Sequence, residues 1–359
     1  MLLPGFGEEG QRKLLKSKVL IAGCGALGTV VANTLARAGV GHLVIVDRDY
    51  IEITNLQRQI LFDESDVENA IPKAVAAKEK IGSINSQIKV TAVVDDLNHT
   101  NIESMIEGCD VIVDGVDNFE TRFLVNDVAV KHGVPYIYAG AVGVVGMCYT
   151  ILPHLASPSV TSNGDPGPGD KRPAGGPCLR CIFEHAPPPG MNPTCDTVGV
   201  LGPVVSVIAN YEAVEALKVI TENWNAINRM MLHVDLWQNT MRQFAVTKAY
   251  EIGDCRCCKH RVFEYLDGKL GSSATTLCGR NAVQLTRNSA DGHKLDFKDL
   301  ASRLRSHCHI QVNKFMLRAA IIDGGHPYEL TLFTDGRAIV KGTKQPEIAK
   351  SIYSKYVGG

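Results

Sequence analysis

A glycine-rich turn between a strand-like and a helix-like stretch constrains the fold of this chain more than any other feature. Residues 17–49 read SKVLIAGCGALGTVVANTLARAGVGHLVIVDRD: an apolar strand, a glycine-rich turn, an amphipathic helix and a second apolar strand. This order predicts a βαβ unit of a parallel sheet. The turn has G-x-G-x-x-G spacing, which lets a phosphate group approach the backbone at the helix N-terminus. The candidate nucleotide-binding residues here are Gly23, Gly25, Ala26 and Gly28.

An acidic residue at the end of the second strand strengthens this interpretation. Asp47 follows Gly28 at about the twenty-residue spacing at which a carboxylate can hold ribose hydroxyls. The simpler interpretation is a tight turn that binds no ligand. The motif by itself does not distinguish NAD from ATP.

The remaining sequence predicts a large α/β domain followed by a small module. Strands and helices alternate through about residue 150, which predicts a Rossmann-like, doubly wound, mostly parallel sheet. We place this domain at 1–261 and a small α+β module of unknown role at 262–359. The Pro/Gly/Ser-rich stretch 155–177 predicts a mobile surface loop, and 186–196 predicts a crossover segment of similar composition.

Two further elements follow from the pattern. GVLGPVVSVIANYEAVEALKVIT predicts a long, mostly buried helix. YELTLFTDGRAIVKG predicts a β-hairpin in the C-terminal module, with Asp335-Gly336 at its turn.

Composition excludes several classes of protein. The net charge is −1, so no basic excess argues for nucleic acid. No apolar run is long enough to span a membrane, and the first residues lack a secretory pattern. We therefore expect a cytoplasmic enzyme. Eleven cysteines are many for such a chain, and they raise the question of metal binding or nucleophilic chemistry.

The stretch VDRDYIEITNLQRQ, residues 46–59, favours a triphosphate over a dinucleotide. A dehydrogenase has no general need for a polar cluster with an arginine beyond its acid. A reaction at a triphosphate does need cations, because charge builds on the departing pyrophosphate. Arg58 supplies a permanent planar cation, and Lys73 can supply a second at a helix start. The polar candidates around them are Thr54, Asn55 and Gln59.

A second polar segment, VDGVDNFETR, follows another strand. It places Asp114, Asp117 and Asn118 at the carboxyl edge, where open α/β sheets bind ligands. An aspartate there can hold Mg²⁺. Each of these residues alone is typical of a solvated loop, whereas their occurrence after successive strands favours a site.

Two C-x-x-C knuckles predict a metal centre. Cys178 and Cys181 form the first, and Cys255 and Cys258 form the second. Four thiolates suit a tetrahedral Zn²⁺ and leave no open position, so we expect a structural role. Free or redox-active thiols are the competing interpretation, and Cys257 competes as the fourth ligand.

Cys195 stands apart in NPTCDTVGV, before the long helix. A thiol near a helix N-terminus tends to have a lowered pKa and to act as a thiolate. We predict a catalytic role for Cys195, against the simpler interpretation of a small residue at a helix start.

At this point the motifs carry a family resemblance. GCGALG, DRDYIEITNLQRQ, PKAVAA, DGVDNFETR, PCLRC and TCDTVGVLGP occur in this order, which resembles the ThiF/MoeB/HesA family of ubiquitin-activating-enzyme-like adenylyltransferases. The resemblance implies that ATP adenylylates the C-terminal Gly-Gly carboxylate of a ubiquitin-like sulfur carrier, ThiS- or MoaD-like, for thiamine or molybdenum cofactor biosynthesis. It also implies a homodimer and an acyl-accepting role for Cys195.

The resemblance assigns roles to the candidate residues. Asp47 would hold the ribose, Arg58 and Lys73 would line the phosphates with Thr54 and Asn55, and Asp117 with Asn118 would serve the Mg²⁺ end. No rhodanese-like domain is visible, so sulfur would come from a separate cysteine desulfurase or rhodanese-like donor. Members of the family carry an R-Y-x-R-Q segment before the stretch that corresponds to MLLPGFGEEG, and we expect a misplaced start or a truncation here.

Different functions remain open from sequence alone. An NAD(P)-dependent oxidoreductase would explain the glycine motif and Asp47, but neither Arg58 nor the cysteine knuckles. A non-catalytic module that binds a carrier would fit the same fold, and so would a relative that adenylates a peptide or tRNA.

Overall fold

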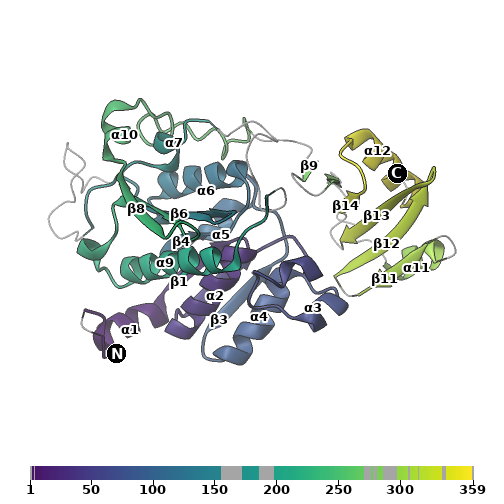
Figure 1. Cartoon of the computed structure of the whole chain (residues 1–359), viewed down its shortest axis with the longest axis horizontal. Helices are drawn as coiled ribbons and strands as arrows, with labels where there is room; N and C mark the ends of the chain where they lie inside the picture. Colours follow the sequence, from purple (N-terminus) through teal and green to yellow (C-terminus); the bar gives the residue numbers. More distant parts are fainter. Residues whose placement is uncertain are drawn as a thin grey trace. The chain divides into compact units, whose positions relative to one another are not determined.

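The computed structural model divides into two compact units (Figure 1). It describes residues 2–3, 5–154, 172–185, 198–270, 276–277, 281–285, 297–305, 308–313, 315–333 and 337–357. The chain stays with the first unit through residue 270, past the boundary at 261 expected from sequence. The reason is that Asp127 accepts the backbone N–H groups of Tyr265 and Leu266.

An eight-stranded sheet forms the centre of the first unit, in the order β3-β2-β1-β4-β5-β6-β7-β8. The strands from β3 to β5 are parallel, and β6, β7 and β8 add antiparallel pairs. The strands are β1 (Lys18–Ala22), β2 (His42–Val46), β3 (Lys89–Val93), β4 (Val111–Asp114), β5 (Tyr136–Val142), β6 (Val145–Ile151), β7 (Met230–Asp235) and β8 (Thr240–Ala245). The predicted mostly parallel Rossmann-like sheet is confirmed.

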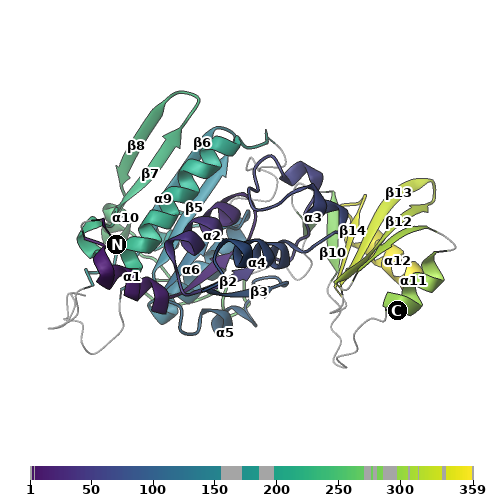
Figure 2. The ribbon, with the colours of Figure 1, turned by 90° about the horizontal axis from the view of Figure 1, so that it is seen from below.

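Helices cover both faces of this sheet, which is why its central strands read as continuous apolar runs (Figure 2). One face packs against α1 (Gly7–Lys16), α2 (Ala26–Ala38), α4 (Lys73–Ile84) and α9 (Gly202–Ile220). The other face packs against α5 (Ile102–Ile106) and α6 (Phe119–His132). The remaining short elements are η1 (Ile53–Asn55), α3 (Glu64–Glu68), α7 (Leu179–Ile182), η2 (Trp224–Ala226) and α10 (Thr247–Ile252). The long helix predicted after residue 197 is confirmed as α9.

The second unit is a six-stranded antiparallel sheet in the order β11-β12-β13-β14-β10-β9. Its strands are β9 (Thr276–Leu277), β10 (Ala282–Leu285), β11 (His309–Val312), β12 (Met316–Asp323), β13 (His326–Phe333) and β14 (Ala338–Lys341). Residues of β10, β12, β13 and β14 form one core with α11 (Phe297–Leu304) and α12 (Pro346–Tyr356), and along β12 and β13 these core residues alternate. The small α+β module and the β13–β14 hairpin are confirmed, while the Asp335-Gly336 turn lies outside the described residues.

Several predicted features fall partly or wholly outside the described chain. Cys195, all of the predicted crossover 186–196 and most of the predicted loop 155–177 are among them. Residues 172–177 are described and contain no helix or strand. None of the described helices is both long and apolar enough to cross a membrane.

Candidate active site and metal centre

Two loops meet at the carboxyl ends of β1 and β4. Gly23 has a φ of +90°, and a Cβ atom there would lie 2.5 Å from the carbonyl oxygen of Gly115. A Cβ atom on Gly115 would in turn lie 2.3 Å from the carbonyl oxygen of Gly23. Both positions therefore need glycine, because a side chain would force the two loops apart.

The glycine turn leads into α2 and leaves backbone donors at its start. The N-cap residue is Gly25, which has no side chain to accept an N–H group of the first turn. Gly28 is pressed against the turn, since a Cβ atom on it would lie 2.1 Å from the carbonyl oxygen of Gly23. The first N–H groups of a helix have no partner within the helix and carry partial positive charge, so this end of α2 suits an anion.

Asp47 lies directly beside this turn, as its position after β2 predicts. Its Oδ2 atom accepts the N–H of Cys24 at 2.7 Å, and its Oδ1 atom accepts the N–H of Asp49 at 2.7 Å. Burial raises the pKa of Asp47, and the nearby charge of Lys73 opposes that rise. Each carboxylate oxygen can accept a further hydrogen bond, so Asp47 can hold a hydroxyl while it fixes the turn.

Lys73 starts α4 and is nearly buried, with its side chain 3% exposed. Its Nζ atom lies 3.1 Å from Asp49 Oδ2, and its N–H donates to the carbonyl oxygen of Asp49 at 2.9 Å. Sequence reasoning missed Asp49, as it missed Arg48, whose guanidinium pairs with Asp96 at 2.6 Å. The alternating charges of D-R-D at a strand end were the signal for both residues.

The turn after β2 holds the other predicted phosphate-side residues. Asn55 is buried, and its Oδ1 atom accepts the N–H of Glu52 at 3.1 Å. Arg58 is half-buried and donates from Nη1 to the carbonyl oxygen of Thr54 at 3.0 Å, while the Thr54 side chain is exposed. Asn55 therefore shapes the turn, and Arg58 is held at its surface by a backbone contact.

Gln59 presents a buried acceptor beside the glycine turn. Its side chain is 3% exposed, and its Oε1 atom has no hydrogen-bond partner in the described chain. The Nε2 atom lies 3.9 Å from the point a Cβ on Gly25 would occupy, so the amide borders the glycine turn. A buried polar atom without a partner is costly, so this oxygen is suited to accept a hydrogen bond from a ligand. This part of the site fits a polar ligand such as a nucleotide.

Asp117 and Asn118 follow β4 at the same edge. Asn118 caps α6, because its Oδ1 atom accepts the N–H of Thr121 at 2.8 Å. Its Nδ2 atom donates to Asp117 Oδ1 at 3.3 Å, and the Asp117 carboxylate is exposed. The carboxylate can reach a metal from solvent, whereas the Asn118 oxygen already serves the helix cap.

A buried ionic network beneath this loop was missed from sequence. Asp114 Oδ2 accepts from Arg122 Nε at 3.0 Å and from the Tyr136 hydroxyl at 2.7 Å. Glu212 of α9 is fully buried and accepts the N–H of Asp114 at 3.0 Å. Burial raises the pKa of Glu212 well above its ordinary value, because a buried carboxylate is poorly solvated. Asp114 therefore belongs to the core, and of the two aspartates only Asp117 is exposed.

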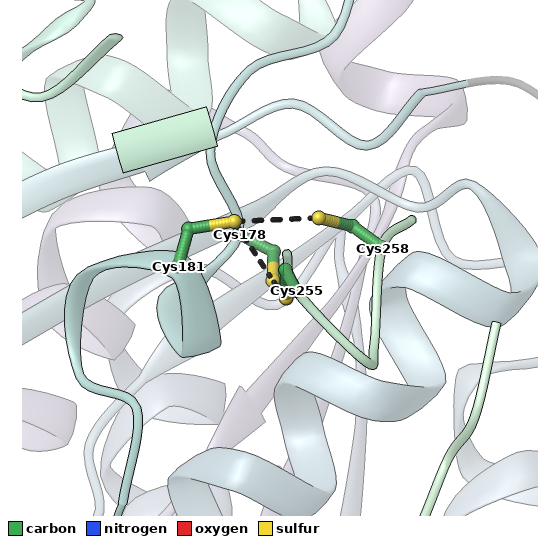
Figure 3. A group of neighbouring side chains, drawn as sticks. All are labelled: Cys178, Cys181, Cys255 and Cys258. Atoms are coloured by element: carbon green, nitrogen blue, oxygen red, sulfur yellow. Dashed lines mark hydrogen bonds between the residues drawn. The ribbon is translucent and has the colours of Figure 1, made fainter. Parts of the chain in front are cut away.

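Four cysteines converge beside α6, in the core on the face of the sheet that α6 covers. Figure 3 shows their sulfur atoms gathered together. The sulfur atoms of Cys178, Cys181, Cys255 and Cys258 all lie within 4.8 Å of one another. The Sγ–Sγ distances are 3.9 Å for 178–181, 3.6 Å for 178–255 and 3.3 Å for 181–258. Four Zn–S bonds of about 2.3 Å in a tetrahedron would space the sulfurs about 3.8 Å apart. The group therefore fits one zinc ion.

Cys257 lies outside this group. Its sulfur accepts a hydrogen bond from Asn126 Nδ2 at 3.3 Å, and its side chain is fully buried. The geometry favours Cys258 as the fourth sulfur.

Comparisons with known proteins bear on the whole chain. A family profile described as the ThiF family matches residues 1–257. The chain is 37% identical over 359 residues to the sulfur carrier protein ThiS adenylyltransferase of Bacillus subtilis, covering 99% of this chain and 97% of that one. It is 34% identical over 248 residues to a sulfur carrier protein adenylyltransferase of Thermus thermophilus, covering 69% and 85%. Among solved structures, E. coli MccB with ATP aligns with a TM-score of 0.53 and 24% identity, over 70% of this chain and 69% of that one. That likeness supports the fold.

Proposed function

Because the chain belongs to the ThiF family, we propose that it transfers AMP from ATP to the C-terminal Gly-Gly carboxylate of a ubiquitin-like sulfur-carrier protein. The observation that carries this proposal is similarity to a ThiS adenylyltransferase along almost the full length of both chains. The same similarity, which includes the C-terminal unit, favours a ThiS-like carrier of thiamine biosynthesis over a MoaD-like one.

The chemistry needs positioning and positive charge. A carboxylate oxygen of the carrier attacks the α-phosphorus of ATP, a new P–O bond forms, and the bond to the β-phosphate breaks with release of pyrophosphate. The attacking carboxylate is already ionised at neutral pH, so the step needs no general base. Negative charge builds on the leaving pyrophosphate, and cations placed there lower the barrier.

Residues at the carboxyl edge of the sheet can bind the different parts of ATP. We assign Arg58 and Lys73 to the phosphates, and Asp47 to the ribose. The backbone of Gly23, Gly25, Ala26 and Gly28 would approach the phosphates, with Thr54, Asn55 and Gln59 as polar neighbours. Support comes from the buried Lys73, the unpaired Gln59 Oε1 atom and the uncapped start of α2, all within the described chain.

Magnesium would bind at the β4 end of the site. The exposed Asp117 carboxylate is the oxygen ligand we assign to it, with Asn118 beside it. When bound, Mg²⁺ supplies charge neutralisation of the phosphate oxygens. The chain's own contribution is to hold Asp117 at a fixed place, since Asn118 ties it to the start of α6.

Zinc would be held by Cys178, Cys181, Cys255 and Cys258 in a closed, structural site. The sulfur spacing fits the ion, and the four positions leave no room for substrate. Measurement of about one zinc per chain in carefully reduced protein tests this assignment.

The partners follow from the proposed reaction. They are a ubiquitin-like carrier, a separate sulfur donor of the cysteine desulfurase or rhodanese-like type, and a second copy of this chain in a homodimer. Cys195 would accept the carrier's acyl group after adenylylation. A cytoplasmic location remains a prediction from sequence.

An oxidoreductase function is not favoured, because the similar proteins of Bacillus subtilis and Thermus thermophilus are named as adenylyltransferases. An assay of nicotinamide absorbance separates the two activities directly.

ATP–pyrophosphate exchange tests the proposed function. We expect exchange that depends on Mg²⁺ and on a purified ThiS-like carrier, with less exchange for a MoaD-like carrier. The matched control is the same carrier without its last glycine, which should support none. Folded protein that gives no exchange with either carrier would contradict the activity, and a preference for the MoaD-like carrier would contradict the carrier assignment.

A further inference from the structure

We propose that Asn126 is the residue that holds the two cysteine knuckles in register for zinc. This proposal rests on the zinc assignment made above and not on the adenylylation reaction. Asn126 lies in the middle of α6 and is fully buried. Asparagine is unfavourable in the interior of a helix, so its presence at this position needs an explanation from tertiary contacts.

The side-chain amide of Asn126 bonds to both knuckles at once. Its Oδ1 atom accepts the N–H of Leu179, the residue after Cys178, at 2.7 Å. Its Nδ2 atom donates to the sulfur of Cys257, inside the second knuckle, at 3.3 Å. The orientation of the amide is fixed chemically, because a backbone N–H can only donate and the oxygen must therefore face Leu179.

This bridge spans a long stretch of chain. Cys178 and Cys255 are 77 residues apart, so their knuckles meet through tertiary structure alone. On the next residue of α6, Asp127 accepts the N–H groups of Tyr265 and Leu266 and clamps the chain beyond the second knuckle. One helix therefore fixes both knuckles before any metal arrives.

The arrangement also explains Cys257. Its sulfur is used as an acceptor for the Asn126 amide, and it lies outside the four-sulfur group. Cys257 thus helps to orient the knuckle without binding the ion. Groups that orient metal ligands in this way typically change metal affinity by about 10- to 100-fold when removed.

Zinc affinity measured by competition with a chromophoric chelator tests the proposal. We expect Asn126→Ala to raise the zinc Kd by about 10-fold or more. Asn126→Asp keeps the acceptor for Leu179 but loses the donor to Cys257, so we expect a loss as well. The matched control is Asn85→Ala, which also removes two hydrogen bonds of an asparagine side chain. Asn85 donates one to the carbonyl oxygen of Ala36 and accepts the other from the N–H of Gln87. It should leave zinc affinity unchanged.

Cys257→Ala gives a second, milder variant if the Asn126 variants do not fold. Loaded with Co²⁺ in place of Zn²⁺, it should keep the visible spectrum of a tetrahedral four-thiolate site while binding the metal more weakly than the unmodified protein.

Three results would overturn the proposal. The first is that folded Asn126→Ala and Asn126→Asp bind zinc as tightly as the unmodified protein. The second is that Cys257→Ala binds Co²⁺ as tightly as the unmodified protein. The third is that the Co²⁺ spectrum of Cys257→Ala shows the loss of one thiolate ligand. Absence of zinc from the unmodified protein would overturn the zinc assignment along with it. None of these readouts depends on pyrophosphate exchange.

Discussion

Replacing Arg122 with methionine should destabilise the first unit strongly. Arg122 is 8% exposed, and its guanidinium donates to Asp114 at 3.0 Å and to the carbonyl oxygens of Val116 and Ala139 at 2.9 Å each. Methionine fills much of the same volume but leaves the buried Asp114 carboxylate without its cation. Breaking a buried ion pair by removing one partner costs about 3–5 kcal/mol, so we expect a loss of that size.

The pH dependence of this loss has a definite sign. Burial raises the pKa of Asp114 in the folded protein, and Arg122 opposes that rise. When the pKa of a group is higher in the folded state than in the unfolded state, protonation of that group favours folding. The contribution of Asp114 to the free energy of unfolding therefore falls as pH rises. Removing Arg122 raises the pKa further. The destabilisation by Arg122→Met should therefore be larger at pH 8 than at pH 6.

Urea unfolding followed by tryptophan fluorescence measures this loss in the first unit, since Trp224 and Trp237, the two tryptophans of the chain, both lie there. Arg229→Met is the matched control, because it removes a guanidinium that donates to the carbonyl oxygens of Ala174 and Gly175. We expect that control to cost about 1–2 kcal/mol. A loss below about 1 kcal/mol for Arg122→Met, the range of a surface ion pair, would refute the reasoning.

The other predictions concern the reaction and the metal. Arg58→Ala should keep the fold, because its described hydrogen bond is to one backbone oxygen, and should lower pyrophosphate exchange about 100-fold; near-normal exchange would remove Arg58 from the phosphate site. Chelation of zinc should lower the melting temperature of the first unit, since structural zinc contributes folding energy; a melting curve that does not move would contradict a structural role. Cys195→Ala should keep exchange within a few-fold, because adenylylation uses no thiol, yet lose any covalent enzyme–carrier species on non-reducing gels. Abolished exchange in folded protein would place the thiol in the first step.

The fold could be predicted because its signals are local. The glycine turn, the apolar strands around it and the acid at the end of β2 follow one another in sequence. The carboxyl ends of parallel strands share one edge, so Asp47, Lys73 and Asp117 were expected there, and the structure places all three after β2, at the start of α4 and after β4. Their proposed roles in the reaction remain predictions.

The buried polar residues could not be predicted in the same way. Arg122, Asn126, Asp127 and Glu212 look in sequence like the solvated side of a helix, because polar residues usually face water. Their partners come from distant parts of the chain: Asn126 contacts a residue 131 positions away, and Asp127 one 138 positions away. No periodicity within α6 or α9 reveals such partners.

Three residues of α6 and its cap connect the four-cysteine group with the proposed nucleotide-binding edge. Asn118, Arg122 and Asn126 are spaced four residues apart, so they lie along one side of α6. Asn118 caps the helix beside Asp117, Arg122 fixes the carbonyl of Val116 in the same loop, and Asn126 bonds to both cysteine knuckles. A helix is stiff over this length, so a displacement at Asn126, in the middle of α6, would be carried to its N-terminal cap. Bound zinc would therefore support the proposed adenylylation without touching ATP, by holding in place the helix from which the Asp117 loop extends.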